Sequence, residues 1–151
     1  RQMCIRDRIK TTKRVIEADD FFMVGRDRTT VLDDDEIVTE IQVPKPAANT
    51  RSKFIKFALR KSIDFPIVNC ASVVEVTGGS VKSARICLNS VYNNPYRAAK
   101  AEETITGKAI DESTAETAGD AAVADVCPAL KSRYKIPIAK TLVKRALLAC
   151  K

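Results

Sequence analysis

The sequence contains no histidine, and this absence excludes several kinds of chemistry. Histidine is the commonest general base near neutral pH, the usual partner of a nucleophilic serine or cysteine, and a frequent zinc ligand. The cysteines are Cys4, Cys70, Cys87, Cys127 and Cys150, and no two have the C-x-x-C spacing of an iron–sulfur cluster or a zinc knuckle. We therefore expect reduced thiols and no metal centre, with Cys70, Cys87 and Cys150 buried as small apolar residues.

Long apolar runs are also absent. No stretch approaches the roughly 18 residues that a membrane-spanning helix requires, and no signal-peptide pattern opens the chain. Hydrophobic residues make up 45% and charged residues 30%, which is typical of a folded globular chain. We expect a cytoplasmic protein that does not enter a membrane.

The net charge of +7 raises the question of nucleic-acid binding. Residues 1–28, 51–100 and 127–151 are basic, whereas residues 29–50 and 101–126 are acidic, so the charge alternates in blocks along the chain. No basic motif interleaved with aromatic residues, helix-turn-helix signature or cysteine–histidine finger accompanies it. We expect no nucleic-acid partner.

The opening octet, residues 1–8, has no periodicity and fits nothing that follows it. It resembles translated adapter sequence, and we expect a non-native leader, with the protein proper beginning near Ile9 and its upstream part missing. A native disordered tip is the alternative.

The next segment, residues 9–46, indicates a short β-rich piece. Residues 11–23 read as a strand, and residues 24–35 as a loop with an acidic run at its end. Residues 36–43 alternate, with the apolar residues Ile37, Ile41 and Val43 and also Thr39 on one face and Val38, Glu40 and Gln42 on the other. Two prolines then end the strand.

Residues 51–151 predict three strands followed by three helices. The strands are expected at 53–60, 67–76 and 81–91, and the helices at 95–106, from a cap at Asp111 to a stop before Pro128, and from Pro137 onward. The pair Gly78-Gly79 lies between two β-rich runs and predicts a hairpin turn rather than a phosphate-binding loop. Strands first and helices afterwards favour an α+β fold, a three-stranded antiparallel sheet packed with three C-terminal helices.

Several motifs in this order resemble one family. The first group is Phe21-Phe22 before a glycine loop, Thr30-Val31-Leu32, the acidic run, Glu36-Ile37-Val38 and Ile41-x-Val43-Pro44. The second is Phe54-x-Lys56, Arg60, Asp64-Phe65-Pro66-Ile67-Val68, Ala84-Arg85-Ile86, Pro95-Tyr96-Arg97-Ala98, Glu102-Glu103, Gly107-Lys108, Tyr134-Lys135, Ala139-Lys140 and Val143-Lys144-Arg145-Ala146-Leu147. Together they resemble the C-terminal part of the FAD-binding (medium) subunit of the xanthine dehydrogenase and carbon monoxide dehydrogenase family of molybdenum hydroxylases.

The resemblance implies that residues 9–46 end an FAD-binding domain and that residues 51–151 form the flavoprotein C-terminal domain. It implies a subunit that passes electrons from 2Fe–2S clusters through FAD to NAD or another acceptor. The clusters belong to a small iron–sulfur subunit and the molybdopterin to a large subunit, both partners of the flavin subunit. The glycine-rich loops that hold the FAD pyrophosphate in this family lie upstream and are not in this sequence, so we expect an incomplete flavin site and no activity of the chain alone.

Two residues match family positions near the flavin. Val38 matches an apolar residue that packs near the ring, with a merely exposed valine as the alternative. Lys56 matches a lysine whose charge would stabilise the reduced ring, with a solvated strand lysine as the alternative. Arg60 and Asp64 are expected to form a structural ion pair, and the run Asp33 to Glu36 a solvated turn without metal.

One further possibility follows from the small number of flavin contacts. Residues 51–151 are expected either to serve the flavin site or to act only as a docking and scaffold domain for partner subunits.

Overall fold

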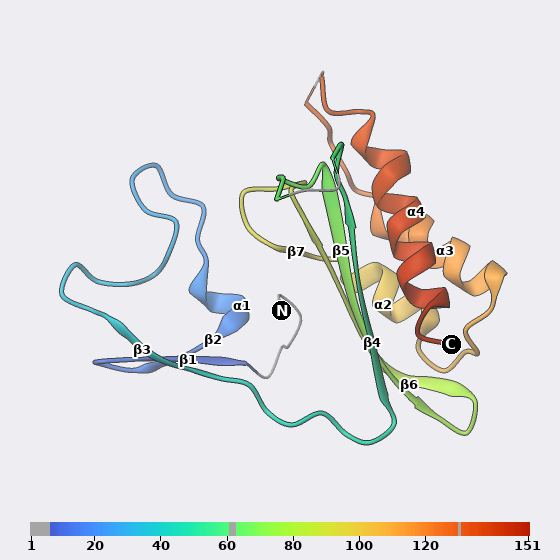
Figure 1. Cartoon of the computed structure of the whole chain (residues 1–151), viewed down its shortest axis with the longest axis horizontal. Helices are drawn as coiled ribbons and strands as arrows, with labels where there is room; N and C mark the ends of the chain where they lie inside the picture. Colours follow the sequence, from blue (N-terminus) through green and yellow to red (C-terminus); the bar gives the residue numbers. More distant parts are fainter. Residues whose placement is uncertain (1–6, 61–62, 130) are drawn as a thin grey trace. The chain divides into compact units, whose positions relative to one another are not determined.

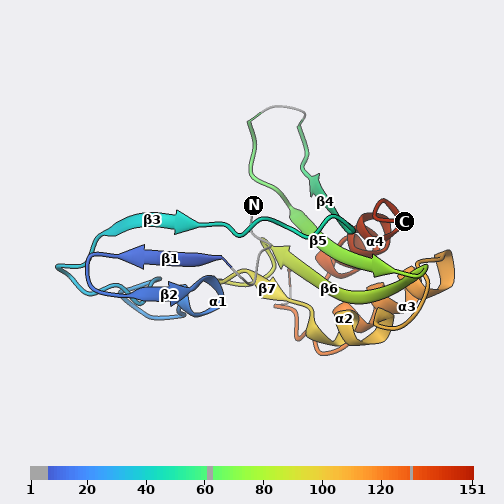
Figure 2. The ribbon, with the colours of Figure 1, turned by 90° about the horizontal axis from the view of Figure 1, so that it is seen from below.

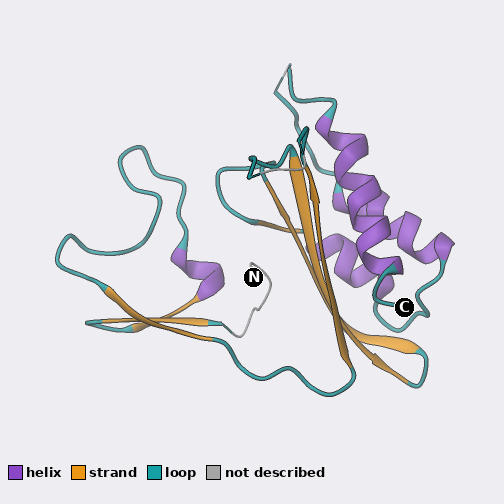
Figure 3. Ribbon diagram, viewed as in Figure 1, coloured by secondary structure: helices purple, strands orange, loops and turns teal. Residues whose placement is uncertain are grey.

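The computed structural model describes residues 7–60, 63–129 and 131–151, and it divides into two compact units. The first unit ends at Pro46, and the second runs from Ala47 to Lys151. The α+β class predicted from the sequence is confirmed, with strands and helices in separate layers of the second unit (Figure 3).

The first unit is a small antiparallel sheet in the order β2-β1-β3 (Figure 2). Its elements are β1 (Arg8–Thr11), β2 (Val15–Glu17), α1 (Ala18–Phe21) and β3 (Val38–Gln42). Its buried apolar residues are Ile9, Ile16 and Phe21, against which Val31, Leu32 and Val38 pack. This core is small, so the hydrophobic effect contributes little to the stability of the first unit.

The outer surface of this unit keeps large apolar side chains in contact with solvent. Ile37 and Ile41 are 68% and 67% exposed. The alternation of residues 36–43 had predicted that this apolar face would be the half-buried one. The structure places it in solvent, because no described residue of the first unit covers it.

The expected leader falls mostly on residues 1–6, outside the described residues. Asp7 and Arg8 take part in the first unit: the carbonyl of Asp7 accepts a hydrogen bond from the Ala18 amide at 2.9 Å, and the Arg8 guanidinium donates to Glu17 at 3.0 Å. The strand predicted over residues 11–23 is shorter and turns into α1 after Glu17.

The second unit is a four-stranded antiparallel sheet with helices on one face (Figure 1). The strand order is β4-β5-β6-β7. The elements are β4 (Thr50–Phe57), β5 (Val68–Thr77), β6 (Ser80–Asn89), β7 (Tyr96–Arg97), α2 (Ala99–Ile105), α3 (Glu112–Ala122) and α4 (Lys135–Leu148). The two central strands supply the core face, where Val68, Cys70 and Val74 of β5 are fully shielded from solvent.

The hairpin between β5 and β6 is confirmed. Gly78 and Gly79 have φ angles of 59° and 80°, the left-handed region that side chains disfavour. The turn therefore joins two paired strands and is not a phosphate cradle.

The fourth strand is a departure from the sequence prediction. A helix was expected from residue 95, but Tyr96 and Arg97 pair with Leu88 and Cys87 as β7, and α2 begins at Ala99. The edge of β6 offers these two residues backbone partners, and this tertiary pairing outweighs the local helix signal of Asn94-Pro95.

The remaining helices follow the prediction closely. Asp111 caps α3, its carboxylate accepting a hydrogen bond from the Thr114 amide at 2.7 Å. The helix ends at Ala122, earlier than expected, and α4 begins two residues before Pro137. None of the helices among the described residues is long and apolar enough to cross a membrane.

Candidate functional site

Lys56 lies near the end of β4 with an exposed side chain. It pairs across the sheet with Asn69 of β5, and Asn69 pairs with Asn89 of β6. Cys70, the next residue on β5, is buried in the core beneath the helices. Because successive side chains of a strand point to opposite faces, Lys56 and Asn69 lie on the face that carries no helix.

The ammonium of Lys56 contacts the turn that follows its strand. Its Nζ donates a hydrogen bond to the carbonyl oxygen of Asp64. The Asp64 carboxylate accepts two hydrogen bonds from Arg60, at 3.0 and 3.2 Å, and one from the Phe65 amide at 3.0 Å. Arg60 first, with smaller help from the charge of Lys56, lowers the pKa of Asp64. The predicted ion pair of Arg60 and Asp64 is confirmed, and the carbonyl of the same Asp64 accepts from Lys56.

Large apolar side chains project from the same connection into solvent. Leu59 and Phe65 are 83% and 92% exposed, and Phe57 at the end of β4 is 43% exposed. Exposed apolar groups in this number beside a fixed cation are typical of a binding surface.

An unpartnered polar atom lies beside Lys56. The side-chain oxygen of Asn69 is buried and has no hydrogen-bond partner among the described residues. An ammonium has three N–H donors, and Lys56 directs one of them to Asp64. Lys56 therefore keeps N–H donors for which the described residues show no acceptor, next to exposed apolar side chains.

Val38 lies in the first unit, and its surroundings differ from those predicted. The strand pairing shifts register between Lys10 and Thr11, so that Lys10 pairs with Glu40 but Thr11 pairs with Val38. This irregularity leaves Thr39 without a residue opposite it on β1 and breaks the simple alternation. Val38 consequently packs against the small apolar core instead of standing alone on a polar face. It remains partly exposed, so its role near a flavin stays a prediction.

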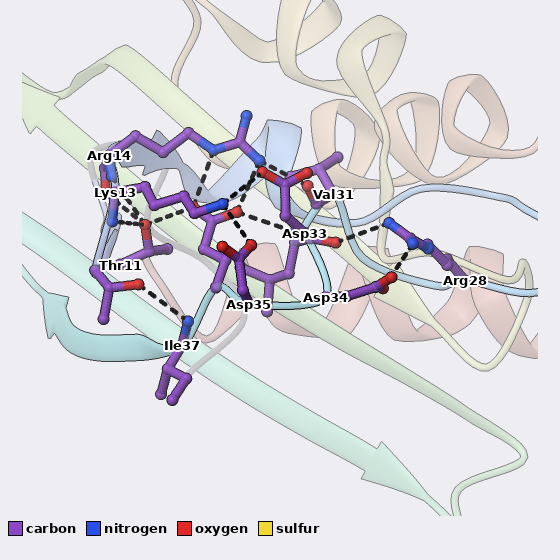
Figure 4. Close-up of polar contacts among 12 residues, drawn as sticks. Thr11, Lys13, Arg14, Arg28, Val31, Asp33, Asp34, Asp35 and Ile37 are labelled. Carbon is purple, nitrogen blue, oxygen red and sulfur yellow. Dashed lines mark hydrogen bonds and ion pairs between the residues drawn. The ribbon is translucent and has the colours of Figure 1, made fainter.

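Polar contacts surround the acidic run (Figure 4), and they include an ion pair that the sequence did not reveal. The Glu36 side chain is fully buried, and its carboxylate accepts hydrogen bonds from Arg14 at 3.0 and 2.9 Å. Thr11 donates to the same carboxylate at 2.5 Å, and the Asp33 amide at 3.1 Å. Arg14 first, then Thr11, lowers the pKa of Glu36 to about 2. The prediction of a solvated turn is wrong for Glu36, because Arg14 supplies the charge that permits its burial.

The other carboxylates of the run are exposed, as predicted. Lys13 pairs with Asp33 and Asp35, at 3.4 and 2.5 Å, and Arg28 pairs with Asp34 at 2.6 Å. No group of three potential ligands that could hold a metal ion occurs among the described residues.

A second buried carboxylate joins β6, β7 and α2. Glu102 accepts hydrogen bonds from the Ile86 amide at 2.9 Å, from Arg85 at 3.1 Å and from Arg97 at 2.8 Å. All of these residues belong to motifs that carry the family resemblance. A glutamate in an otherwise apolar helix face, with two arginines in nearby motifs, was the available signal.

The cysteines differ in their surroundings. Cys70 and Cys150 are buried as predicted, Cys87 is half-buried, and Cys127 is exposed. Burial raises the pKa of the Cys70 thiol to about 12, so this thiol is inert near neutral pH.

A cavity of about 530 Å³ lies in the second unit. Leu88, Tyr92, Tyr96, Val126 and Ile136 contribute to its mainly apolar lining. Neither Val38 nor Lys56 lines it.

The sequence is similar to those of known flavoprotein subunits. Residues 53–150 match the family of CO dehydrogenase flavoprotein C-terminal domains. The carbon monoxide dehydrogenase medium chain of Hydrogenophaga pseudoflava is 34% identical over 141 residues, covering 91% of this chain and 48% of that protein. A putative xanthine dehydrogenase FAD-binding subunit of Escherichia coli is 23% identical over 121 residues, covering 77% of this chain and 41% of that protein.

A solved structure shows the same fold. Carbon monoxide dehydrogenase from Hydrogenophaga pseudoflava, in a form lacking the Mo-pyranopterin moiety, matches with a TM-score of 0.87 and 34% identity. The match covers 97% of this chain and 53% of that one. The chain thus spans about half the length of the relatives that it matches.

Proposed function

The chain belongs to the family of CO dehydrogenase flavoprotein C-terminal domains, and on this premise we propose that it is the C-terminal part of the FAD subunit of a molybdenum hydroxylase. The observation that carries the proposal is Lys56, a cation with free donors on the helix-free face of the matched domain, beside the unpartnered oxygen of Asn69. Relatives named as FAD-binding or medium subunits support the same assignment.

The subunit would stand between two partners in an electron path. Electrons would arrive from 2Fe–2S clusters on an iron–sulfur small subunit, after substrate oxidation at molybdopterin on a large subunit, and would leave to NAD or another acceptor. Bound FAD supplies the redox chemistry of this step, and the protein holds and tunes it. Such a complex would work in the cytoplasm.

Within this role the chain supplies charge and position. Lys56 would place a positive charge near the ring and favour the added negative charge of its reduced state. Arg60 holds the Asp64 side chain, and the Asp64 carbonyl would in turn orient the Lys56 ammonium. Val38 would offer apolar contact from the edge of its small core.

The alternative is a docking and scaffold domain without a flavin role. The two readings predict different results when the chain is joined to the upstream half of the Hydrogenophaga pseudoflava medium chain. A flavin subunit would yield a yellow chimera that retains FAD through gel filtration, and Lys56→Ala would weaken retention while Lys53→Ala on the same strand would not. Equal retention by both variants would favour the scaffold.

The chain alone is expected to hold FAD weakly or not at all, since the pyrophosphate loops of the family lie upstream. Tight copurification of FAD with residues 9–151 would contradict this expectation.

A further inference from the structure

β4 forms one edge of the larger sheet, and its outer side has no strand partner among the described residues. The Val76 amide donates to the Asn49 carbonyl at 3.2 Å, which marks residues 49 and 76 as a hydrogen-bonded pair. Bonded and non-bonded pairs alternate along an antiparallel ladder. The backbone groups of Arg51, Lys53 and Ile55 therefore point toward β5, and those of Ser52 and Phe54 point away from the sheet.

This edge is open to an incoming chain. Arg51, Ser52, Lys53 and Phe54 are all exposed, and the Phe54 side chain is 51% exposed. An exposed row of unpaired N–H and C=O groups is a template for strand addition. We define Arg51 to Ile55 as the β4 edge.

The charged residues of the β4 edge, Arg51 and Lys53, are both basic. Arg51 and Lys53 point to the helix side, where their charges act on the Cys150 thiol at the end of α4. Among the described residues, Arg51 and Lys53 form no ion pair. Lys82 on β6, by contrast, pairs with Glu75 at 2.9 Å. A strand lying on this edge would meet two cations on one face and the Phe54 ring on the other.

A second copy of the chain is a poor occupant. Two β4 edges paired antiparallel about Lys53 would place the two lysines opposite each other, and pairing about Ser52 would place each Arg51 opposite a Lys53. Like charges directly opposite across a ladder are destabilising. Both of these registers are therefore disfavoured, whereas a strand with acidic residues at these positions would meet opposite charges.

We propose that the β4 edge is a docking site for an extended acidic–apolar segment of another polypeptide, bound as an added antiparallel strand. Because the added strand is antiparallel, its N-terminal residue lies opposite Ile55 and its C-terminal residue opposite Arg51, and this order determines its residue types. It carries apolar residues opposite Ile55 and Phe54, an acidic residue opposite Lys53, a small polar residue opposite Ser52, and an acidic residue opposite Arg51. The segment stops short of Lys56, so this interaction does not depend on the flavin role of that residue.

The test uses the whole chain and a blocked peptide with the central sequence Val-Val-Glu-Thr-Glu, flanked by glycine and serine. Binding is followed by NMR, with the amides of Ser52 and Phe54 expected to shift most. Ser52→Pro removes an outward N–H that the β4–β5 ladder does not use, and proline is tolerated at strand edges. We expect this variant to bind the peptide about tenfold more weakly, and the matched Ser52→Ala to bind as the unaltered chain does.

Charge reversal gives an independent arm that needs no proline. Lys53→Glu should lose the acidic peptide and gain a peptide with lysine in place of the first glutamate. Absence of binding to the unaltered chain, equal binding by Ser52→Pro, or indifference to the charge swap would overturn the proposal. Concentration-dependent dimers of the chain that Ser52→Pro abolishes would overturn it in favour of a second copy.

Discussion

Arg14 forms a bidentate ion pair with the carboxylate of Glu36, donating from Nε at 3.0 Å and from Nη2 at 2.9 Å. The Glu36 side chain is fully shielded from solvent, while that of Arg14 is 47% exposed. The pair joins the loop after β1 to the end of the acidic run, in a unit with few buried apolar residues. We therefore expect this ion pair to contribute strongly to the stability of the first unit.

The Arg14–Glu36 ion pair should make the stability of the first unit depend on pH in the acid range. The folded pKa of Glu36, about 2, lies below its ordinary value of 4.5, so its contribution is present above pH 4.5 and is lost as the pH falls toward 2. Glu36→Gln should lower the midpoint of thermal unfolding at pH 7, and the difference from the unaltered chain should shrink below pH 4.5. Circular dichroism melts across this range measure it. Asp34→Asn, at an 89% exposed side chain, is the control and should change the midpoint little.

Glu102 should be equally important to the second unit. Its carboxylate is 6% exposed and satisfies the Ile86 amide and two arginines. Glu102→Ala would remove the acceptor of that amide and one acceptor of each arginine, at a cost of about 2–3 kcal/mol, because the arginines can still reach water. Chemical denaturation measures the loss. Glu103→Ala, at the exposed neighbouring position, should cost much less, and equal losses would mean that Glu102 is not an anchor.

The contact of α3 with α4 depends on the absence of a side chain at Gly119. A Cβ there would lie 2.8 Å from the backbone carbonyl oxygen of Lys140. Gly119→Ala gains roughly 1 kcal/mol of helix propensity but must push the two helices apart, so we expect net destabilisation of about 1–2 kcal/mol. Thr117→Ala, on the exposed side of the same helix, should be neutral or stabilising. A Gly119→Ala variant more stable than the unaltered chain would show that the helices separate at little cost.

The sequence predicted best where local chemistry determines the structure. Gly78-Gly79 specifies a hairpin through its positive φ angles, and Asp111 specifies a helix start through its cap. It predicted less well where a distant partner decides. Tyr96 and Arg97 become a strand because β6 offers an edge, and Glu36 is buried because Arg14, 22 residues earlier, neutralises it.

The candidate site shows the same division. The Arg60–Asp64 pair is local, four residues apart, and followed from the sequence. Val38 was assigned to the wrong surroundings, because alternation cannot anticipate the register shift opposite Thr11. The unpartnered oxygen of Asn69 beside Lys56 depends on strand register and could not be read from spacing.

The most direct test of the account concerns the charge of Lys56. In the chimera with the upstream half of the relative, the flavin midpoint potential is measured for the unaltered protein, for Lys56→Gln and for the control Lys53→Gln. We predict that Lys56→Gln lowers the flavin midpoint potential on the order of 50 mV, because a cation near the ring favours its reduced state. Lys53→Gln should leave the midpoint potential unchanged. Equal potentials in all three proteins would contradict the assignment of Lys56 to the flavin site.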